Sequence, residues 1–546
     1  MTTSFGTLLN DLINETVQTS LCHFAPELAL SATIVMLLLL RLFGSVDRWI
    51  PPYFTTLVGS LVALGLCGTQ LLDLLNGSQE PGPFFTGLLV FDHFGAFVRG
   101  LLALFLVLVV ALTVLTGIPD REDGPDFYSL MLGSTIGMMI MASANHMLMF
   151  FVGIEMASVP GYAMVAFLKG NKKSSEAAFK YVVYGAGAAG VMLYGISLLT
   201  GLLGTASLPD MASHLAIVLG DGGGAGSAEG RTVLLAVLMV LVGLAFKLSL
   251  VPFHFWCPDV FEGASAEVAA FLSVASKGAA FALLVRFCLA LVGTHPSAYP
   301  EFLTGIGLGL GVIAAVTVTF GNLAAYSQTN VKRLLAYSTI AHAGFMLMAV
   351  SALVVVMANG AAVQGFAVDK AAVMCVEGLL FYLFVYLFMN LGAFAVIALL
   401  RNQTFSEELD SFNGVGWQAP ALCTCMVLCI FSLVGLPPLG GFWGKLVIFM
   451  SLFNIASNVH WFMWVLLVVG GANTVFSLFY YIKILKAMFM KEPLENARTV
   501  EVPSTIGNYA LLIALPVLLL GFFPTWTTSL ARNVASYLLE PLFAAL

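Results

Sequence analysis

Ionisable side chains inside long apolar stretches are the residues of this 546-residue sequence best suited to chemistry. A charged side chain at the centre of a bilayer costs about 2.5–3.5 kcal/mol on insertion scales, and such residues usually serve a function. One acid, four lysines and two histidines stand out: Glu155, Lys180, Lys247, His254, Lys277, His342 and Lys445. All three residue types can exchange protons, so the sequence predicts a path that moves protons across a membrane.

Lys247 lies in an apolar stretch that Pro252 interrupts five residues later. Proline removes a backbone donor, so the helix is expected to break there. Burial disfavours the charged forms of Lys247 and Glu155, and an opposite charge nearby restores them. We therefore predict a Glu155–Lys247 switch, in which a positive charge arriving at Glu155 releases the proton of Lys247. The alternative is a static ion pair that only fixes packing.

Two further lysines differ in their surroundings. Lys277 has the small neighbours Ser276 and Gly278, which leave room for water and favour a proton relay. Lys180 follows Glu176 by four residues, so a local ion pair on one helix is an alternative to a relay role.

The rest of the predicted path lies in the second half of the chain and beside the first break. His342 follows hydroxyl residues, and its ordinary pKa of about 6.5 suits a proton shuttle, although hydrogen-bonded packing is the alternative. Lys445 is the only charged residue of its span, and His254 could link Lys247 to a cytoplasmic entry. Arg286 is expected to pair structurally, and Asp92 is expected to pair with Arg99.

Composition identifies a polytopic membrane protein. Hydrophobic residues make up 60% of the chain and charged residues 9%, with a mean hydropathy of +0.98, whereas soluble domains are about 25% charged. No nucleotide-binding loop, Rossmann fingerprint or nucleic-acid patch is present. The eight cysteines show no metal-binding spacing, and the Cys423-x-Cys425 pair is interpreted as packing.

About 20 apolar residues are needed for each membrane-spanning helix. We count fourteen such segments, at 25–44, 54–74, 94–117, 127–144, 147–168, 177–203, 232–256, 264–293, 302–321, 331–356, 375–401, 418–453, 461–489 and 505–524. The twelfth contains Pro437 and Pro438 and should form two half-helices around a break, like the seventh.

Lysine and arginine placement predicts the orientation. Connections after odd-numbered spans hold 13 of the 22 basic residues, the even-numbered connections and the C-terminus hold three, and six fall within spans. Odd-numbered connections are therefore expected in the cytoplasm, with both termini outside.

An internal repeat is visible at an offset of 185 residues. The segment from Asn145 matches that from Asn330, and Phe246–Pro252 matches Phe431–Pro437, while Glu176 matches Glu377 at an offset of 201. Five spans per unit would invert the second unit, a pattern of ion-coupled transporters. The predicted division is an N-terminal three-helix segment at 1–125, repeats at 126–295 and 296–490, and a C-terminal helix and tail at 491–546.

Three long motifs resemble the antiporter-like subunits of respiratory complex I. The segment from Lys247 to Ala264 is similar to the family signature K-x-x-x-x-P-F-H-x-W-x-P-D-x-Y-E-G-x-P. The stretches 332–342 and 433–445 support it, and the resemblance extends over about residues 20–525. One departure is Ser265-Ala266-Glu267, where the family usually has a proline and this chain adds a carboxylate.

The resemblance implies fourteen helices with inverted repeats at spans 4–8 and 9–13, a Glu155–Lys247 pair, a relay at Lys277 and His342, and a terminal lysine at Lys445. It implies a proton-translocating subunit of NADH–quinone oxidoreductase with no cofactor in this chain, while NADH, FMN, Fe–S clusters and quinone act in other subunits. The implied partners are membrane-arm subunits of the A, H, J, K, L and M types and the lipid bilayer, with no nucleic acid. The implied location is the bacterial inner membrane, with both termini periplasmic. The alternative function is a subunit of a Na⁺(K⁺)/H⁺ antiporter without redox coupling.

Overall fold

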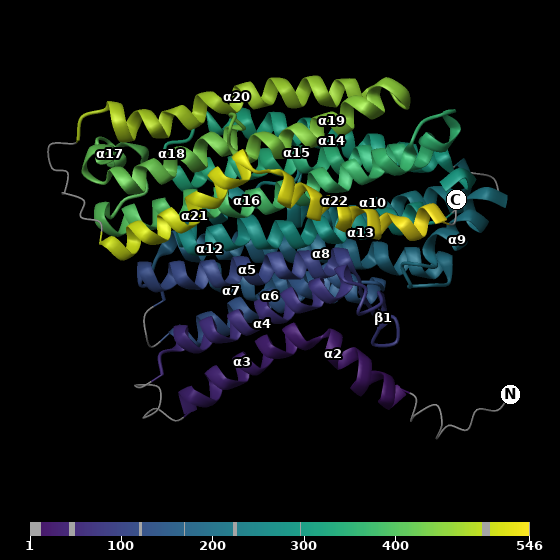
Figure 1. The fold of residues 1–546 in the computed structure, drawn as a ribbon, viewed down its shortest axis with the longest axis horizontal. Coiled ribbons are helices and arrows are strands. Elements are labelled where there is room, and N and C mark those ends of the chain that lie inside the picture. The colour runs from purple at the N-terminus through teal and green to yellow at the C-terminus, as the bar shows by residue number, and fades with distance from the viewer. Residues whose placement is uncertain are drawn as a thin grey trace.

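A bundle of long helices makes up nearly all of the computed structural model, which describes residues 12–42, 50–119, 123–168, 170–221, 226–294, 296–493 and 503–544. The helices run roughly along the horizontal of Figure 1, as spans that share one membrane would. Most of the Gly-rich loop at 221–230 lies outside the described residues, as do Arg48, Arg121, Lys169 and Arg498 of the charge count.

The elements follow the predicted order of spans. The N-terminal part contains η1 (Thr16–Ser20), α2 (Leu21–His23), α3 (Ala25–Leu42), α4 (Pro52–Leu75), an antiparallel hairpin of β1 (Gly82–Phe84) and β2 (Leu89–Phe91), and α5 (His93–Thr116). Next come α6 (Gly124–Ser143), α7 (Met147–Val165), α8 (Lys172–Leu203), α9 (Met211–Ala216), η2 (Ile217–Asp221), α10 (Ala228–Leu248), α11 (Trp256–Gly263), α12 (Ala266–Phe271), η4 (Leu272–Ser276) and α13 (Lys277–Val292).

The second half begins with η5 (Pro296–Ala298), α14 (Pro300–Ala325), α15 (Val331–Asn359), η6 (Gly360–Ala362) and α16 (Val368–Thr404). It continues with η7 (Leu409–Phe412), α17 (Val415–Gln418), α18 (Pro420–Val434), α19 (Gly440–Asn458), α20 (Phe462–Met490), α21 (Ser504–Phe522) and α22 (Thr525–Ala544). Thirteen helices in the described ranges are long and apolar enough to span a membrane, or fourteen with one bent pair counted. The all-helical, polytopic prediction is confirmed, and α6 occupies the place of the fourth predicted span without being among the thirteen.

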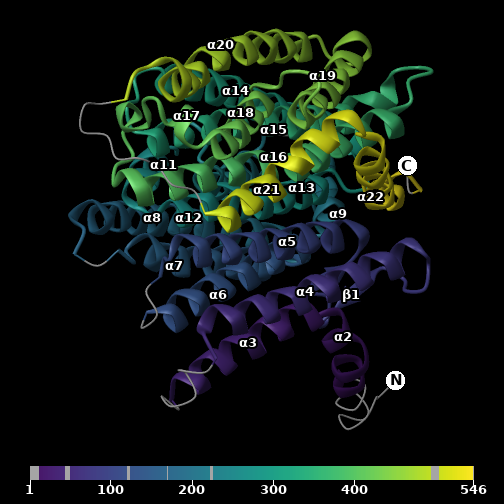
Figure 2. The same cartoon turned by 60° about the vertical axis from the view of Figure 1, so that its left-hand side comes forward.

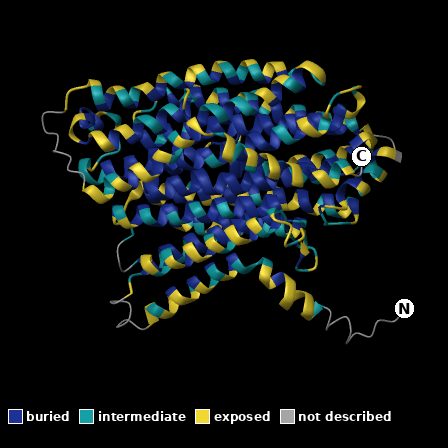
Figure 3. Ribbon diagram, in the orientation of Figure 1, coloured by how far each residue is buried: buried dark blue, intermediate teal, exposed yellow. Residues whose placement is uncertain are grey.

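Three spans form the centre of the bundle. The apolar stretches of α12–α13 and α15 are wholly buried, and that of α16 is 94% buried, whereas α3, α4 and α20 are largely exposed. Figure 3 shows the same arrangement, with buried residues concentrated in the middle and exposed residues on the outer helices. Ionisable residues on the three central spans are therefore shielded from lipid on all sides.

Both predicted breaks are present, and both use the same backbone cap. At the end of α10, Ser249 is left-handed (φ 57°), and Leu250 N–H donates to the Ala245 carbonyl at 2.8 Å. At the end of α18, Gly435 is left-handed (φ 89°), and Leu436 N–H donates to Phe431 at 3.0 Å. This is a Schellman-type ending. The two caps are 186 residues apart, one more than the predicted offset, so Lys247 matches Leu433 in backbone position and not Ser432.

Two isolated β-bridges mark the repeat elsewhere. His146 caps α7 and pairs with Ser207, while Asn330 caps α15 and pairs with Glu408. The caps are 184 residues apart and their partners 201, so the predicted slip between α7–α8 and α15–α16 is confirmed. The start of α15 contacts α11 and, through it, the start of α8, which follows the end of α7. Consequently α15 begins where α7 ends, and the second unit is inverted.

The chain ends wrap around the bundle. Figure 2 shows α3 and α4 at one edge and α21 with α22 across the flank. Arg532 of α22 pairs with the buried Glu377 of α16 (2.9 Å), and Tyr537 stacks on His93 of α5 (3.9 Å). The tail predicted after the last span is thus a helix attached to both halves of the molecule.

Candidate functional site

The first break places Lys247 against α7. Its Nζ donates a hydrogen bond to Ser158 Oγ at 2.9 Å, and Ser158 in turn donates to the Ile154 carbonyl at 2.6 Å. Glu155 lies one turn before Ser158 on the same helix and within electrostatic range of Lys247, but the two side chains form no ion pair within 4.0 Å. The predicted partners therefore lie close together, with the Ser158 hydroxyl as the direct contact of the lysine.

Lys277 lies just after a π-helical turn. The turn η4 widens the helix between α12 and α13, a distortion often found at functional sites. Lys277 Nζ donates to the Thr339 carbonyl of α15 at 3.2 Å, and the side chain is almost fully buried. The π-helical turn thus directs a central lysine toward the helix that carries His342.

His342 is held between two tyrosines. Its Nδ1 is 2.6 Å from the Tyr382 hydroxyl of α16, and its Nε2 is 3.2 Å from the Tyr481 hydroxyl of α20. Tyr481 also bonds the hydroxyl of Ser338. His342 is within electrostatic range of both Lys277 and Lys445, so it stands between the two lysines.

Lys445 follows the second break in sequence but returns to it in space. Its Nζ donates to the carbonyls of Leu433 (3.0 Å) and Val434 (2.8 Å), the last residues of α18, and lies 4.5 Å from the centre of the Phe345 ring. A helix C-terminus carries partial negative charge, which stabilises a cation. Each break therefore has a lysine ammonium at its half-helix end, supplied by the preceding helix in one unit and by the following helix in the other.

Two residues of the predicted path make other contacts. His254 is buried in the first break, where its ring packs on Phe255 and on Phe320 of α14, and its Nδ1 has no hydrogen-bond partner within the described protein. Lys180 bonds Asp259 at 2.7 Å and Glu176 at 2.9 Å. The local pair with Glu176, the stated alternative, is therefore present, although it does not exclude a role in proton transfer.

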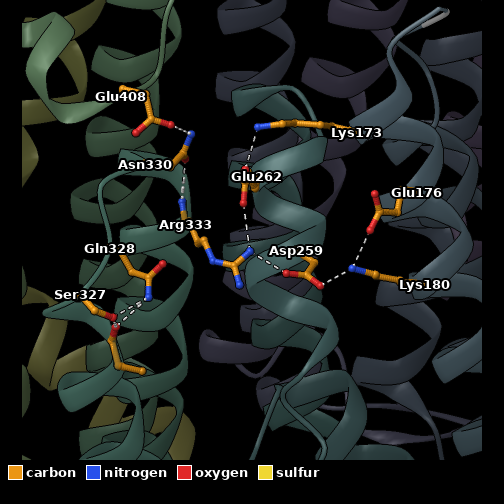
Figure 4. Close-up of polar contacts among 11 residues, drawn as sticks. Lys173, Glu176, Lys180, Asp259, Glu262, Ser327, Gln328, Asn330, Arg333 and Glu408 are labelled. Atoms are coloured by element: carbon orange, nitrogen blue, oxygen red, sulfur yellow. Dashed lines mark hydrogen bonds and ion pairs between the residues drawn. The ribbon is translucent and has the colours of Figure 1, made fainter.

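Lys180 belongs to a group of charged residues that joins the two repeats (Figure 4). Arg333 of α15 bonds Asp259 at 2.6 Å and Glu262 at 3.0 Å on α11, and Lys173 of α8 bonds Glu262 at 3.0 Å. Partial burial acts to raise the pKa of each α11 carboxyl, but hydrogen bonds from the cations outweigh it and hold both pKa values below the ordinary range. The short helix after the first break is thus clamped at its charged end.

Several polar residues of the site were not predicted. Tyr386 of α16 accepts a hydrogen bond from Asn390 at 3.1 Å, and Asn390 also donates to Ser273 of the π-helical turn at 2.6 Å. Together with Tyr382, Tyr481 and Ser158, they supply most of the hydroxyl contacts in the centre. Hydroxyl residues in apolar spans are common, so no signal in the sequence separated these from ordinary packing residues.

The ion pairs outside the series also differ from expectation. The predicted Asp92–Arg99 pair is wrong: Arg99 pairs with the buried Glu27 of α3 at 2.6 Å, and Asp92 pairs with Arg286 at 2.7 Å. The structural role expected for Arg286 is confirmed by this contact. Asp92 caps the start of α5, while Arg99 lies two turns inside it, so the helix rotation directs the two side chains to different neighbours.

The described residues contain no group of three or more His, Cys, Asp or Glu side chains that could hold a metal ion. Cys423, Cys425 and Cys429 are buried free thiols of α18.

A family model for membrane subunits, described as NADH:quinone oxidoreductase/Mrp antiporter, matches residues 144–474. The match spans more than half of the chain and includes both breaks and Lys247, Lys277 and Lys445. The chain belongs to this family. The resemblance inferred from the motifs is therefore confirmed.

Individual relatives narrow the similarity. NADH-quinone oxidoreductase subunit N of Anaeromyxobacter sp. (strain Fw109-5) is 36% identical, over 96% of this chain and 98% of the relative. A chain of respiratory complex I from Thermus thermophilus with bound aureothin is 30% identical, with a TM-score of 0.70 over 93% of this chain and all but 1% of its own length. A chain of the Mrp complex from Dietzia sp. DQ12-45-1b gives a TM-score of 0.78 over 96% of this chain and 99% of its own, but at 19% identity this likeness concerns the fold alone.

Proposed function

We propose that this chain is the N-type membrane-arm subunit of a proton-translocating NADH–quinone oxidoreductase. The observation that carries the proposal is the buried series Lys247, Lys277, His342 and Lys445, which extends across both inverted repeats of a chain 36% identical to subunit N proteins. The histidine of the 332–342 motif, at His342, agrees with the N type. NADH, FMN, Fe–S clusters and quinone act in other subunits, and this chain contributes the translocation step.

The proposed mechanism uses charge to move protons. A positive charge arriving near Glu155 weakens its attraction to Lys247, so that Lys247 passes its proton toward Lys277. His342 then carries the proton between its tyrosine partners to Lys445, and water bridges the gaps. His254 and Lys180 remain proposed carriers on the entry side, with Lys180 acting from within the charged group of α8, α11 and α15.

The partners proposed are the A-, H-, J-, K-, L- and M-type membrane subunits. Glu155 is only half-buried on α7, and its neighbours Met156 and Val159 are exposed. A carboxylate that faces lipid is costly, so a neighbouring subunit is expected to cover this face. The proposed location is the bacterial inner membrane with both termini in the periplasm, which agrees with the charge asymmetry of the connections.

The deciding experiment substitutes the switch residues in the assembled complex. Lys247→Ala and Glu155→Ala should lower NADH-driven proton pumping in proteoliposomes at least tenfold, because each removes a group that must change charge, while the complex still assembles. The exposed Lys370→Ala is the control and should pump at the wild-type rate. Normal pumping in both switch variants would contradict the mechanism.

The second candidate is a Na⁺(K⁺)/H⁺ antiporter subunit without redox coupling, which the fold likeness to the Mrp complex favours. Purification distinguishes the two functions. A complex that copurifies with this chain and oxidises NADH with quinone supports the first, whereas cation-dependent proton exchange without such activity supports the second.

A further inference from the structure

A polar cavity opens at the charged end of the bundle, where α8, α11, α15 and α16 approach one another. It has a volume of about 160 Å³, enough for several water molecules. Its polar lining includes Lys173, Glu262, Lys332, Arg401 and Glu407. By the positive-inside rule this end faces the cytoplasm, so the cavity is a water-accessible recess on the side from which protons are taken up.

Lys332 forms the floor of this cavity. Its side chain is almost fully buried, and its Nζ bonds Glu407 at 2.8 Å and the Ala264 carbonyl at 2.5 Å. Arg401 approaches the other oxygen of Glu407 at 3.6 Å. Ala264 is the residue directly before the N-cap of α12, so the lysine connects the cavity to the start of the helix that leads to Lys277.

Glu267 lies in the first turn of that helix and is buried, with 1% of its surface exposed. Its Oε2 has no hydrogen-bond partner within the described protein. The ionisable groups in electrostatic range of it come from three other helices: Lys332 of α15, Tyr128 of α6 and Tyr509 of α21. A buried carboxylate oxygen without a partner is costly, and ordered water is the usual remedy.

The same continuous helix carries Glu267, Ser273 and Lys277 through α12, the π-helical turn and α13. Ser273 accepts a hydrogen bond from Asn390, whose Oδ1 is a second buried acceptor without a partner in the described protein. Asn390 also donates to Tyr386, which lies beside Thr339, and the carbonyl of Thr339 accepts from Lys277. Two unpartnered acceptors thus flank the gap between Glu267 and the polar residues that lead to Lys277.

We propose that Glu267, reached from the cavity past Glu407 and Lys332, is the carboxylate through which cytoplasmic protons enter the buried series at Lys277. Glu267 accepts a proton from water in the cavity, forming a carboxylic acid, and releases it to water beside Ser273 and Asn390, so the carboxylate is regenerated in each cycle. This inference rests on the proposed function. It gives a role to the carboxylate that stands where the motif resemblance leads one to expect a proline.

The test uses the purified complex that contains this chain, reconstituted in liposomes. Glu267→Gln keeps the shape of the side chain but cannot carry a proton, and we expect NADH-driven pumping at least tenfold below wild type. Glu267→Asp keeps the carboxyl group and should pump within about threefold of wild type. Asp410→Asn, an exposed carboxylate at the same end that pairs with Lys491, is the control and should pump normally.

Rescue by a small weak acid separates a carrier from a structural role. Sodium azide, whose conjugate acid can deliver protons inside a small cavity, should restore quinone reduction in Glu267→Gln but not in Lys277→Met. Wild-type pumping in assembled Glu267→Gln, or no rescue by azide, overturns the proposal. If Glu267→Gln does not assemble, Glu407→Gln decides: a pumping rate at least threefold below wild type supports the entry route, and a wild-type rate overturns it. Normal pumping in Lys277→Met would instead contradict the proposed function itself.

Discussion

At the scale of residues, the oxygen that each lysine meets distinguishes the members of the series. Lys247 donates to a serine hydroxyl, Lys277 to a mid-helix carbonyl, and Lys445 to two carbonyls at a helix end. Carbonyls only accept hydrogen bonds, whereas a hydroxyl can also donate, so only the contact of Lys247 can take up either protonation state without rearrangement. This difference suits Lys247 to a switch and His342, with two tyrosine hydroxyls, to a shuttle.

The tyrosine contacts of His342 give a prediction for a single hydroxyl. Tyr382→Phe removes the 2.6 Å contact with Nδ1 and should lower the pumping rate about three- to tenfold, because water can replace part of the lost contact. The rate is measured as fluorescence quenching in proteoliposomes. The matched control is Tyr299→Phe, a buried tyrosine that bonds the Leu291 carbonyl away from the series. Equal rates in the two variants would contradict a role for Tyr382.

At the scale of elements, the two breaks show how one backbone design serves different chemistry. Each ends a half-helix in a left-handed residue, which exposes carbonyls that a lysine can approach. In the first unit the short helix α11 follows the break and is clamped by Lys173, Lys180 and Arg333. In the second unit the 19-residue α19 follows and carries the lysine itself. The clamp therefore compensates for the shortness of α11.

The clamp predicts a dependence of stability on pH. The pKa values of Asp259 and Glu262 lie below the ordinary carboxyl range in the folded protein, so their ion pairs are fully present above about pH 5 and are lost as the pH falls through the folded values. Exposed pairs contribute at most about 1 kcal/mol each. Asp259→Asn should lower the melting temperature of the complex slightly at pH 7 and reduce its decline between pH 5 and 3. An unchanged decline in the variant would argue against the clamp.

The attachment of α3 to α5 depends on a buried ion pair. Arg99→Leu leaves Glu27 buried without a cation, and breaking such a pair costs about 3–5 kcal/mol. The double variant Glu27→Gln/Arg99→Leu removes both charges and should recover most of that loss. Assembly yield and melting temperature in detergent measure both effects. A double variant as unstable as the single one would show that the pair is not the cause.

At the scale of the whole molecule, inversion of the second unit places the starts of α8 and α15 at one end of the bundle. Basic and acidic residues of both units meet there, beside the cavity that ends at Lys332. The opposite end carries fewer cations, as the charge count predicted. Inversion also lets α15 and α16 pack in the centre with α12 and α13, so a single buried series can pass from one unit to the other.

Orientation can be tested by labelling cysteines. Cys22 is exposed and the other seven native cysteines are buried, so Cys22→Ser provides a background without accessible thiols among the described residues. In that background, Asp410→Cys should react with an impermeant maleimide in inside-out vesicles, and Lys370→Cys in right-side-out vesicles, because the two positions lie in connections after spans 11 and 10. The reverse pattern would place both termini in the cytoplasm.

Much of the fold could be predicted from the sequence because its causes are local. Apolar length determines the spans, proline and glycine determine the breaks, and Glu155, Lys247, Lys277, His342 and Lys445 are visible as costly exceptions within those spans. The repeat was also visible, though its offset was uncertain by one residue at each landmark. These features follow from each segment alone, so no knowledge of the neighbouring helices was needed.

Only the tertiary structure decided which groups meet. Spacing along one helix suggested Asp92 with Arg99, yet helix rotation gives Asp92 to Arg286 and Arg99 to Glu27. Ser158, Tyr382, Tyr481 and the unpartnered oxygen of Glu267 gain their meaning from residues more than 40 positions away or on other helices. A sequence determines the cost of placing a charge in the membrane, because that cost belongs to one residue and its depth. It does not determine the partner that offsets the cost, because that depends on how helices rotate and pack against one another.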